Sequence, residues 1–101
     1  MQEISKEDAN RFLSAVPEDK KFFCNNGEVF STLKELENSL MTMNQEVFEY
    51  HVNEEKNDFS SWIYDVIGHT ELAAAVRNVK DRKRIAKQLQ KSIKTLKKVA
   101  N

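Results

Sequence analysis

Apolar residues recur along the chain at spacings of three and four, the periodicity of helices with one buried face. The clearest segment surrounds Trp62, where apolar positions at i, i+3, i+4, i+7 and i+8 predict a strongly amphipathic helix. These positions are Phe59, Trp62, Ile63, Val66 and Ile67. We expect Asn57 or Asp58 to cap this helix at its start and Gly68 to end it.

Three shorter helices are predicted before this one. Ser5 and Thr32 each stand three residues before an acidic side chain, which is typical of a helix N-terminal cap. The predicted helices cover residues 5–16, 32–43 and 45–52, and Asn44 is expected to cap the third of them. The first of them is expected to end before Pro17, because the residue before a proline is pushed out of the helical region. The expected buried face of the second consists of Leu33, Leu36, Leu40 and Met41.

Residues 21–30 predict a β-hairpin between the first two helices. At its centre is Asn26-Gly27, a pair that tolerates the positive φ angles of tight hairpin turns. Two strands alone are marginal in water, so the hairpin must pack on helices. The predicted fold is α+β and predominantly helical: a small β-hairpin packed on a bundle of about five to six short helices, with a long basic amphipathic C-terminal helix.

The longest predicted helix covers about residues 81–100, after a short helix over residues 71–78 that Thr70 is expected to cap. Its apolar stripe consists of Ile85, Leu89, Ile93, Leu96 and Ala100. A basic row follows the opposite face at spacings of four and three residues: Lys80, Arg84, Lys87, Lys91, Lys94 and Lys98. At 1.5 Å rise per residue, this row is about 27 Å long.

Charged residues are unevenly distributed along the chain, and the excess of basic residues is in this helix. The 101 residues have a formal net charge of zero at pH 7. However, residues 1–76 contain 15 acidic and 6 basic side chains, whereas residues 77–101 contain 10 basic side chains and one acidic. Such asymmetry is typical of an acidic body that carries a basic binding element. The length predicts a single domain, residues 1–101, with an N-terminal helix and connector (1–20), a hairpin and helical core (21–78), and the basic helix (79–101).

The basic row predicts contact with nucleic acid or a ribosome surface, because a line of cations matches the spread of a phosphate backbone. Lysine favours diffuse electrostatic contact over base reading, and no aromatic residue interrupts the row to stack on single strands. One alternative is a protein partner or self-association, with Tyr50, Tyr64 and the turn after His51 as candidate contacts. Another is a solvated helix whose lysines pair with the acidic body. We expect no membrane contact, since no apolar run approaches about 20 residues.

The sequence predicts neither an enzyme nor a cofactor. It contains no Gly-rich phosphate loop and no HExxH motif, and its one cysteine, Cys24, lies in an apolar strand and is expected to be inert. Two histidines and one cysteine in separate segments do not predict a structural zinc site. A small metal protein or enzyme built on His51 with Glu54, Glu55 or Asp58 is the weakest alternative. The polar, acidic N-terminus is unlike a signal peptide, so we expect a cytoplasmic protein.

One block of the sequence is more specific than the rest: His51-Val52-Asn53, then Asn57-Asp58-Phe59 and Trp62. Together with Asn26-Gly27 and the leucines of residues 33–40, it resembles a small, mostly archaeal family of uncharacterised domains over residues 23–74. That family has no assigned activity, so the resemblance implies no catalytic residues. It implies that the block is a family hallmark. From the residues themselves we expect a fixed turn, in which Asn53 and Asp58 hold the chain and His51 hydrogen-bonds across it. The basic helix lies outside the resemblance, and His69 departs from the acidic residue expected after the glycine.

Overall fold

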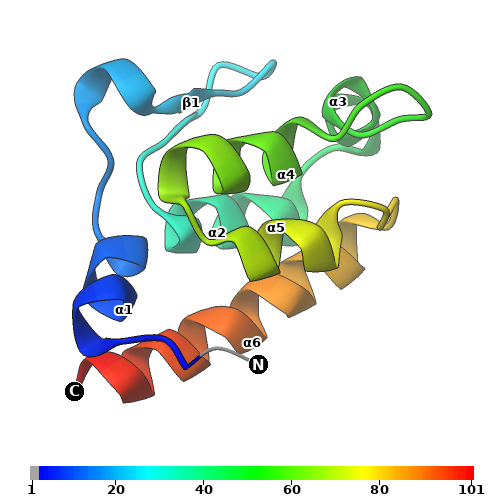
Figure 1. The fold of residues 1–101 in the computed structure, drawn as a ribbon. Coiled ribbons are helices and arrows are strands. Elements are labelled where there is room, and N and C mark those ends of the chain that lie inside the picture. Colours follow the sequence, from blue (N-terminus) through cyan, green and yellow to red (C-terminus); the bar gives the residue numbers. More distant parts are fainter. Residues whose placement is uncertain (1–2) are drawn as a thin grey trace.

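A computed structural model describes residues 3–101 and shows the predicted fold class, a helical domain with one small hairpin (Figure 1). The elements are α1 (Lys6–Leu13), η1 (Glu18–Lys20), β1 (Phe22–Phe23), β2 (Val29–Phe30), α2 (Leu33–Thr42), α3 (Gln45–His51), α4 (Asp58–Trp62), η2 (Ile63–Ile67), α5 (Thr70–Val76) and α6 (Arg82–Ala100). The first η segment is a single 3-10 turn and the second is a π-helical turn. The α+β, predominantly helical class with its long C-terminal helix is therefore confirmed.

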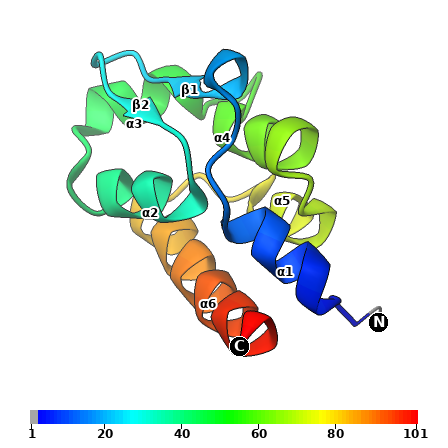
Figure 2. The same ribbon diagram turned by 90° about the vertical axis from the view of Figure 1, so that its left-hand side faces the viewer.

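The long helix α6 forms one side of the molecule, and α1, α2 and α5 pack against it. In both views the antiparallel hairpin lies on the far side of the molecule from α6 (Figures 1 and 2). One cluster of buried side chains extends from Phe12 in α1 through Phe59 in α4 to Leu96 in α6. The hairpin joins the same cluster through Phe22 and Phe30, so it packs on helices as expected.

Side-chain caps begin four of the helices at the predicted residues. Ser5, Thr32, Asn44 and Asn57 each accept a hydrogen bond from a backbone N–H two or three residues further on. Asn57, and not Asp58, is thus the cap of α4. Thr70 does not cap α5, because His69 Nδ1 accepts the N–H of Leu72 at 3.3 Å instead.

The first helix is shorter than predicted. It ends at Leu13, and Ser14 has an extended backbone with φ −77° and ψ 158°. The N–H of Val16 donates to the carbonyl of Ser31 at 2.9 Å, which ties this stretch to the chain leaving the hairpin. This contact between residues that are remote in sequence holds the chain in an extended conformation, so the helix ends several residues before Pro17.

The segment predicted as one uniform helix consists of α4 and the π-helical turn η2. Gly68 ends η2 with φ +88°, and its N–H donates to the carbonyl of Ile63 at 2.8 Å, five residues back. A π turn holds more residues than an α turn and so rotates the side chains within it. As a result Ile63 and Ile67 are buried, whereas Val66 is only half-buried.

Two further details differ from expectation. In the hairpin turn only Gly27 has a positive φ, +91°, and Asn26 does not. The turn is wider than a two-residue Asn-Gly turn, since the N–H of Gly27 donates to the carbonyl of Cys24 at 2.9 Å and Gly27 alone is left-handed. Met41 was expected in the core but is 54% exposed, and the buried apolar side chains of α2 are Leu33, Leu36 and Leu40.

Candidate nucleic-acid interface

The helix α6 is held in place by its cap and by its apolar stripe. Asp81 caps it by accepting the N–H of Arg84 at 3.1 Å. The buried side chains of the helix are Ile85, Leu89, Ile93 and Leu96, which recur every three or four residues, and Ala86 beside Ile85. Burial of this stripe against α1, α2 and α5 fixes which side of α6 faces solvent.

The solvent-facing side of α6 carries a line of cations that we name the basic face. Its members are Arg84, Lys87, Lys91, Lys94 and Lys98, and all five are exposed. They alternate with the buried stripe at helical spacing, so they lie on the opposite side of the helix. From Arg84 to Lys98 the basic face extends about 21 Å along the helix axis.

The predicted first member of the row, Lys80, does not belong to the basic face. It precedes the cap of α6, and its Nζ forms an ion pair with Glu54 Oε1 at 2.8 Å. The hydrogen bond from Lys80 lowers the pKa of the Glu54 carboxyl below its ordinary value. The predicted place of Lys80 in the helical row was wrong, because the helical spacing was continued through Asp81, where the helix begins. A contact of Lys80 with nucleic acid stays a prediction.

The basic face is not neutralised by the acidic part of the protein. Among residues 3–101, no carboxylate lies within ion-pair distance of any of its five cations. Elsewhere the chain does form local pairs, such as Arg11 with Asp8 at 2.9 Å. The alternative in which the lysines of α6 pair with the acidic body is therefore not observed.

A neighbouring arginine has a structural role that sequence reasoning missed. Arg82, the first residue of α6, is partly buried, and its Nη1 donates to the carbonyl of Leu40 near the end of α2. Its position next to several exposed basic residues gives no signal of this role. Arg82 thus anchors the start of α6 to α2, while the basic face points to solvent.

The structure brings His51 and Asp58 of the hallmark turn together. His51 Nδ1 is 2.9 Å from Asp58 Oδ2, and the backbone N–H of Asn25 donates to His51 Nε2 at 3.0 Å. Because His51 Nε2 accepts this hydrogen bond, the ring proton is on Nδ1, and Nδ1 donates a hydrogen bond to the carboxylate of Asp58. The buried imidazole therefore connects the hairpin turn to the start of α4.

The remaining hallmark residues hold backbone. Asn53 Oδ1 accepts the N–H of Glu55 at 3.0 Å inside the turn. Asn57 caps α4, and its amide also donates to the carbonyl of Val76 at 3.0 Å, which links α4 to the end of α5. Trp62 Nε1 donates to the carbonyl of Lys20 at 2.9 Å. Asn57 and Trp62 thus join segments that are separate in the chain, whereas Asn53 stabilises its own turn.

Cys24, His51 and Asp58 lie in the order of a nucleophile, a base and an orienting acid. Cys24 Sγ is 3.6 Å from His51 Nε2, but that nitrogen already accepts the Asn25 N–H. Cys24 is only 6% exposed and His51 only 4%, so both side chains are buried in the core. Glu54 and Glu55 point to solvent rather than to His51, and among residues 3–101 no three His, Cys, Asp or Glu side chains are placed to hold a metal ion.

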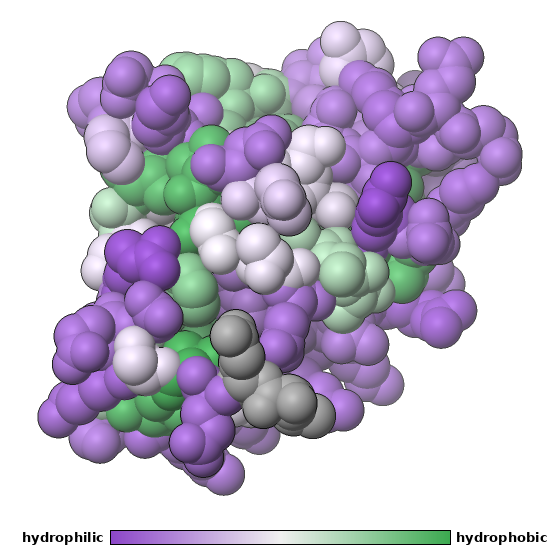
Figure 3. All heavy atoms as spheres, viewed as in Figure 1, coloured by the Kyte–Doolittle hydropathy of each residue, from purple (hydrophilic) through white to green (hydrophobic). Residues whose placement is uncertain are grey.

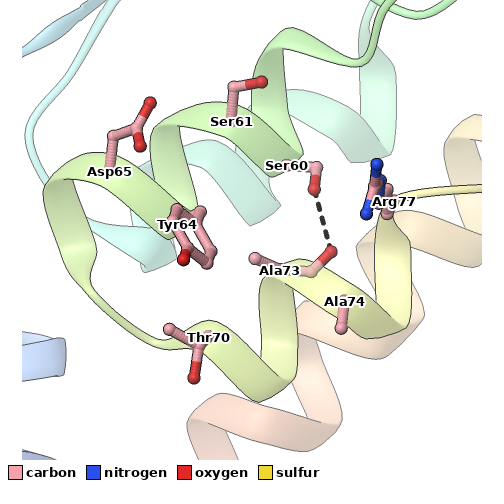
Figure 4. A pocket seen from close by; sticks show the side chains of 8 residues that line it. All are labelled: Ser60, Ser61, Tyr64, Asp65, Thr70, Ala73, Ala74 and Arg77. Carbon is pink, nitrogen blue, oxygen red and sulfur yellow. Dashed lines mark hydrogen bonds between the residues drawn. The ribbon is translucent and has the colours of Figure 1, made fainter.

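A groove of about 320 Å³ between α4–η2 and α5 was not expected from the sequence (Figure 4). Across its floor, the Ser60 hydroxyl donates to the carbonyl of Ala73 at 2.8 Å. Tyr64 forms one wall and is 59% exposed, in line with its expected position off the apolar stripe. Asp65 and Arg77 lie at opposite ends of the groove. Only the packing of α4 on α5 brings these residues together.

Comparison of the chain with protein-family models, with curated proteins and with solved structures found no match. The resemblance of residues 23–74 to an archaeal family therefore stays a prediction. No helix within residues 3–101 is long and apolar enough to cross a membrane.

Proposed function

We propose that the protein is a small non-enzymatic nucleic-acid-binding protein. In this proposal the basic face of α6 contacts the phosphate backbone of RNA or DNA, either free or on the surface of a ribosome. The observation that carries the proposal is that five exposed cations line one side of a helix and that, within residues 3–101, none of them forms an ion pair.

The energetics of α6 favour a polyanionic partner. Like charges three or four residues apart on a helix repel by a few tenths of a kcal/mol per pair. The buried stripe of α6 offsets this repulsion in the free protein. A phosphate backbone would remove the repulsion and release the counterions condensed on the nucleic acid, which is the main source of sequence-independent affinity.

A salt titration of binding tests the proposal. Fluorescence anisotropy would follow the protein binding to labelled generic RNA and to labelled duplex DNA. If all five cations neutralise a phosphate, log K against log salt concentration has a slope of about −4.5 on duplex DNA. In the triple variant Lys87→Glu, Lys91→Glu, Lys94→Glu we expect binding to be lost, while the circular dichroism spectrum is unchanged because all three side chains are exposed.

A matched control separates the position of the charges from their number. The double variants Lys87→Glu with Lys91→Glu and Lys6→Glu with Lys20→Glu change the net charge equally, and all four side chains are exposed. The first pair should weaken binding and reduce the salt slope, whereas the second pair should leave the slope unchanged. Equal effects of the two pairs, or no binding of the native protein at low salt, would overturn the proposal.

A further inference from the structure

The groove between α4–η2 and α5 differs from the rest of the surface because its centre carries no charge. Charged residues make up 32% of the chain. Yet the surface over α4 and α5 is pale in Figure 3, with strongly hydrophilic residues on its right and hydrophobic ones on its left. The middle of the groove is formed by Ser60, Ala73 and Ala74, with the ring of Tyr64 beside them. The small side chains of the floor leave room for another surface, and the exposed ring of Tyr64 belongs to a residue type that is enriched in protein interfaces.

The two ends of the groove carry opposite charges. Asp65 lies at one end and Arg77 at the other (Figure 4). Both side chains are exposed, and neither has an ion-pair partner in the described residues 3–101. The groove is therefore an uncharged strip with an unmatched anion at one end and an unmatched cation at the other.

Such a strip is complementary to itself. If a two-fold axis lies in the plane of the interface and crosses the middle of the groove at right angles to its length, the acidic end of one copy meets the basic end of the other, and the same contact occurs twice. We propose that this groove is the interface of a symmetric dimer of the chain. In the dimer Arg77 pairs with Asp65 of the second copy, and the Tyr64 rings fill the space over the small residues of the floor.

Two properties of the whole chain favour the second copy as the occupant. The formal net charge is zero at pH 7, so two copies do not repel each other as net charges do. Tyrosine and arginine are also the residues most enriched in protein interfaces, where other charges are depleted from the centre. The groove shares no residue with the basic face, so this inference does not depend on nucleic-acid binding.

Sedimentation velocity over a range of protein concentrations tests the dimer. We expect the native protein to pass from monomer to dimer as its concentration rises. The variants Asp65→Arg and Arg77→Glu each place two like-charge pairs in the symmetric interface. Each should raise the dissociation constant by more than tenfold, or about 1.4 kcal/mol.

Mixing the two variants is the decisive measurement. A heterodimer of Asp65→Arg with Arg77→Glu has one native pair and one reversed pair, and both are attractive. We therefore expect the mixture to dimerise with nearly native affinity, although neither variant does so alone. Ala74→Glu, which puts a charge in the centre of the groove, should prevent dimerisation in every combination.

Further controls exclude a different mode of association. The triple variant of the basic face should still dimerise, because the proposed interface does not include α6. A head-to-tail contact between the basic helix of one copy and the acidic body of another would instead be lost in this variant. Equal thermal melting curves would show that the exposed substitutions leave the fold intact. The inference is overturned if the native protein stays monomeric at all concentrations, if the single variants dimerise normally, or if mixing them restores nothing.

Discussion

The two histidines are buried in the protein for different structural purposes. His51 connects the hairpin to α4 through Asn25 and Asp58. His69 stacks on Phe12 with ring centroids 4.8 Å apart, and its Nδ1 caps α5. Burial lowers the pKa of His69 below its ordinary value of 6.5, and the nearby carboxylate of Glu71 opposes this effect. His69 therefore stays neutral at pH values at which an exposed histidine would begin to bind a proton.

This shift predicts a pH dependence of stability. Below pH 6.5 the unfolded chain binds a proton at residue 69 more readily than the folded chain does, so the stability that His69 contributes is present above 6.5 and lost as the pH falls. His69→Asn keeps a cap acceptor but cannot titrate. Between about pH 7.5 and 5.5 its free energy of unfolding, measured with urea, should fall less than that of the native protein. Equal falls in the two proteins would contradict the assignment.

Asn57 combines two roles that can be separated by comparison with Asn44. Both residues cap a helix, but only Asn57 also donates to the carbonyls of Val76 and Arg77. We expect Asn57→Ala to lower the free energy of unfolding by about 2 kcal/mol and Asn44→Ala by about 1 kcal/mol. Urea titrations of the two variants measure the difference. If the two losses were equal, the link from α4 to α5 would contribute nothing.

At the scale of elements, helix starts were predictable and helix ends were less so. A start depends on one capping side chain, such as Thr32 or Asn44, that can be read from the sequence. The end of α1 depends on the contact of Val16 with Ser31, which no local pattern reveals. The π-helical turn η2 was also missed, because its apolar spacing fits an α-helix equally well.

Gly68 is the residue that lets η2 turn into α5, and its replacement has a predictable cost. Gly68→Ala forces a side chain into the left-handed region at φ +88°, which should cost about 1–2 kcal/mol of stability. A Cβ there would also lie 3.2 Å from Arg11 Nη1, the mobile tip of an exposed side chain. Gly27→Ala, at φ +91° with open space around it, is the matched control. Urea unfolding should give similar losses for both, and a neutral Gly68→Ala would contradict this account.

At the scale of the whole molecule, the basic face could be predicted and the groove could not. The basic face needs only the spacing of one helix, whose buried side is fixed by its own apolar residues. The groove needs the packing of α4 on α5, which places Tyr64 of one segment beside Ala73 and Ala74 of another. For the same reason the ion pair of Lys80 with Glu54 was missed, since these residues are remote in sequence.

The basic face lies along one side of a protein whose formal net charge is zero, so the molecule has an electric dipole with its positive pole along α6. A molecule without net charge is not attracted to a polyanion as a charged molecule is, but the electric field of the polyanion orients its dipole before contact. The protein would therefore approach a nucleic acid with α6 facing it, and fewer encounters would begin with another side of the molecule. Because salt screens such fields within about 10 Å at 0.1 M ionic strength, this orientation would be set only in the last moments before contact.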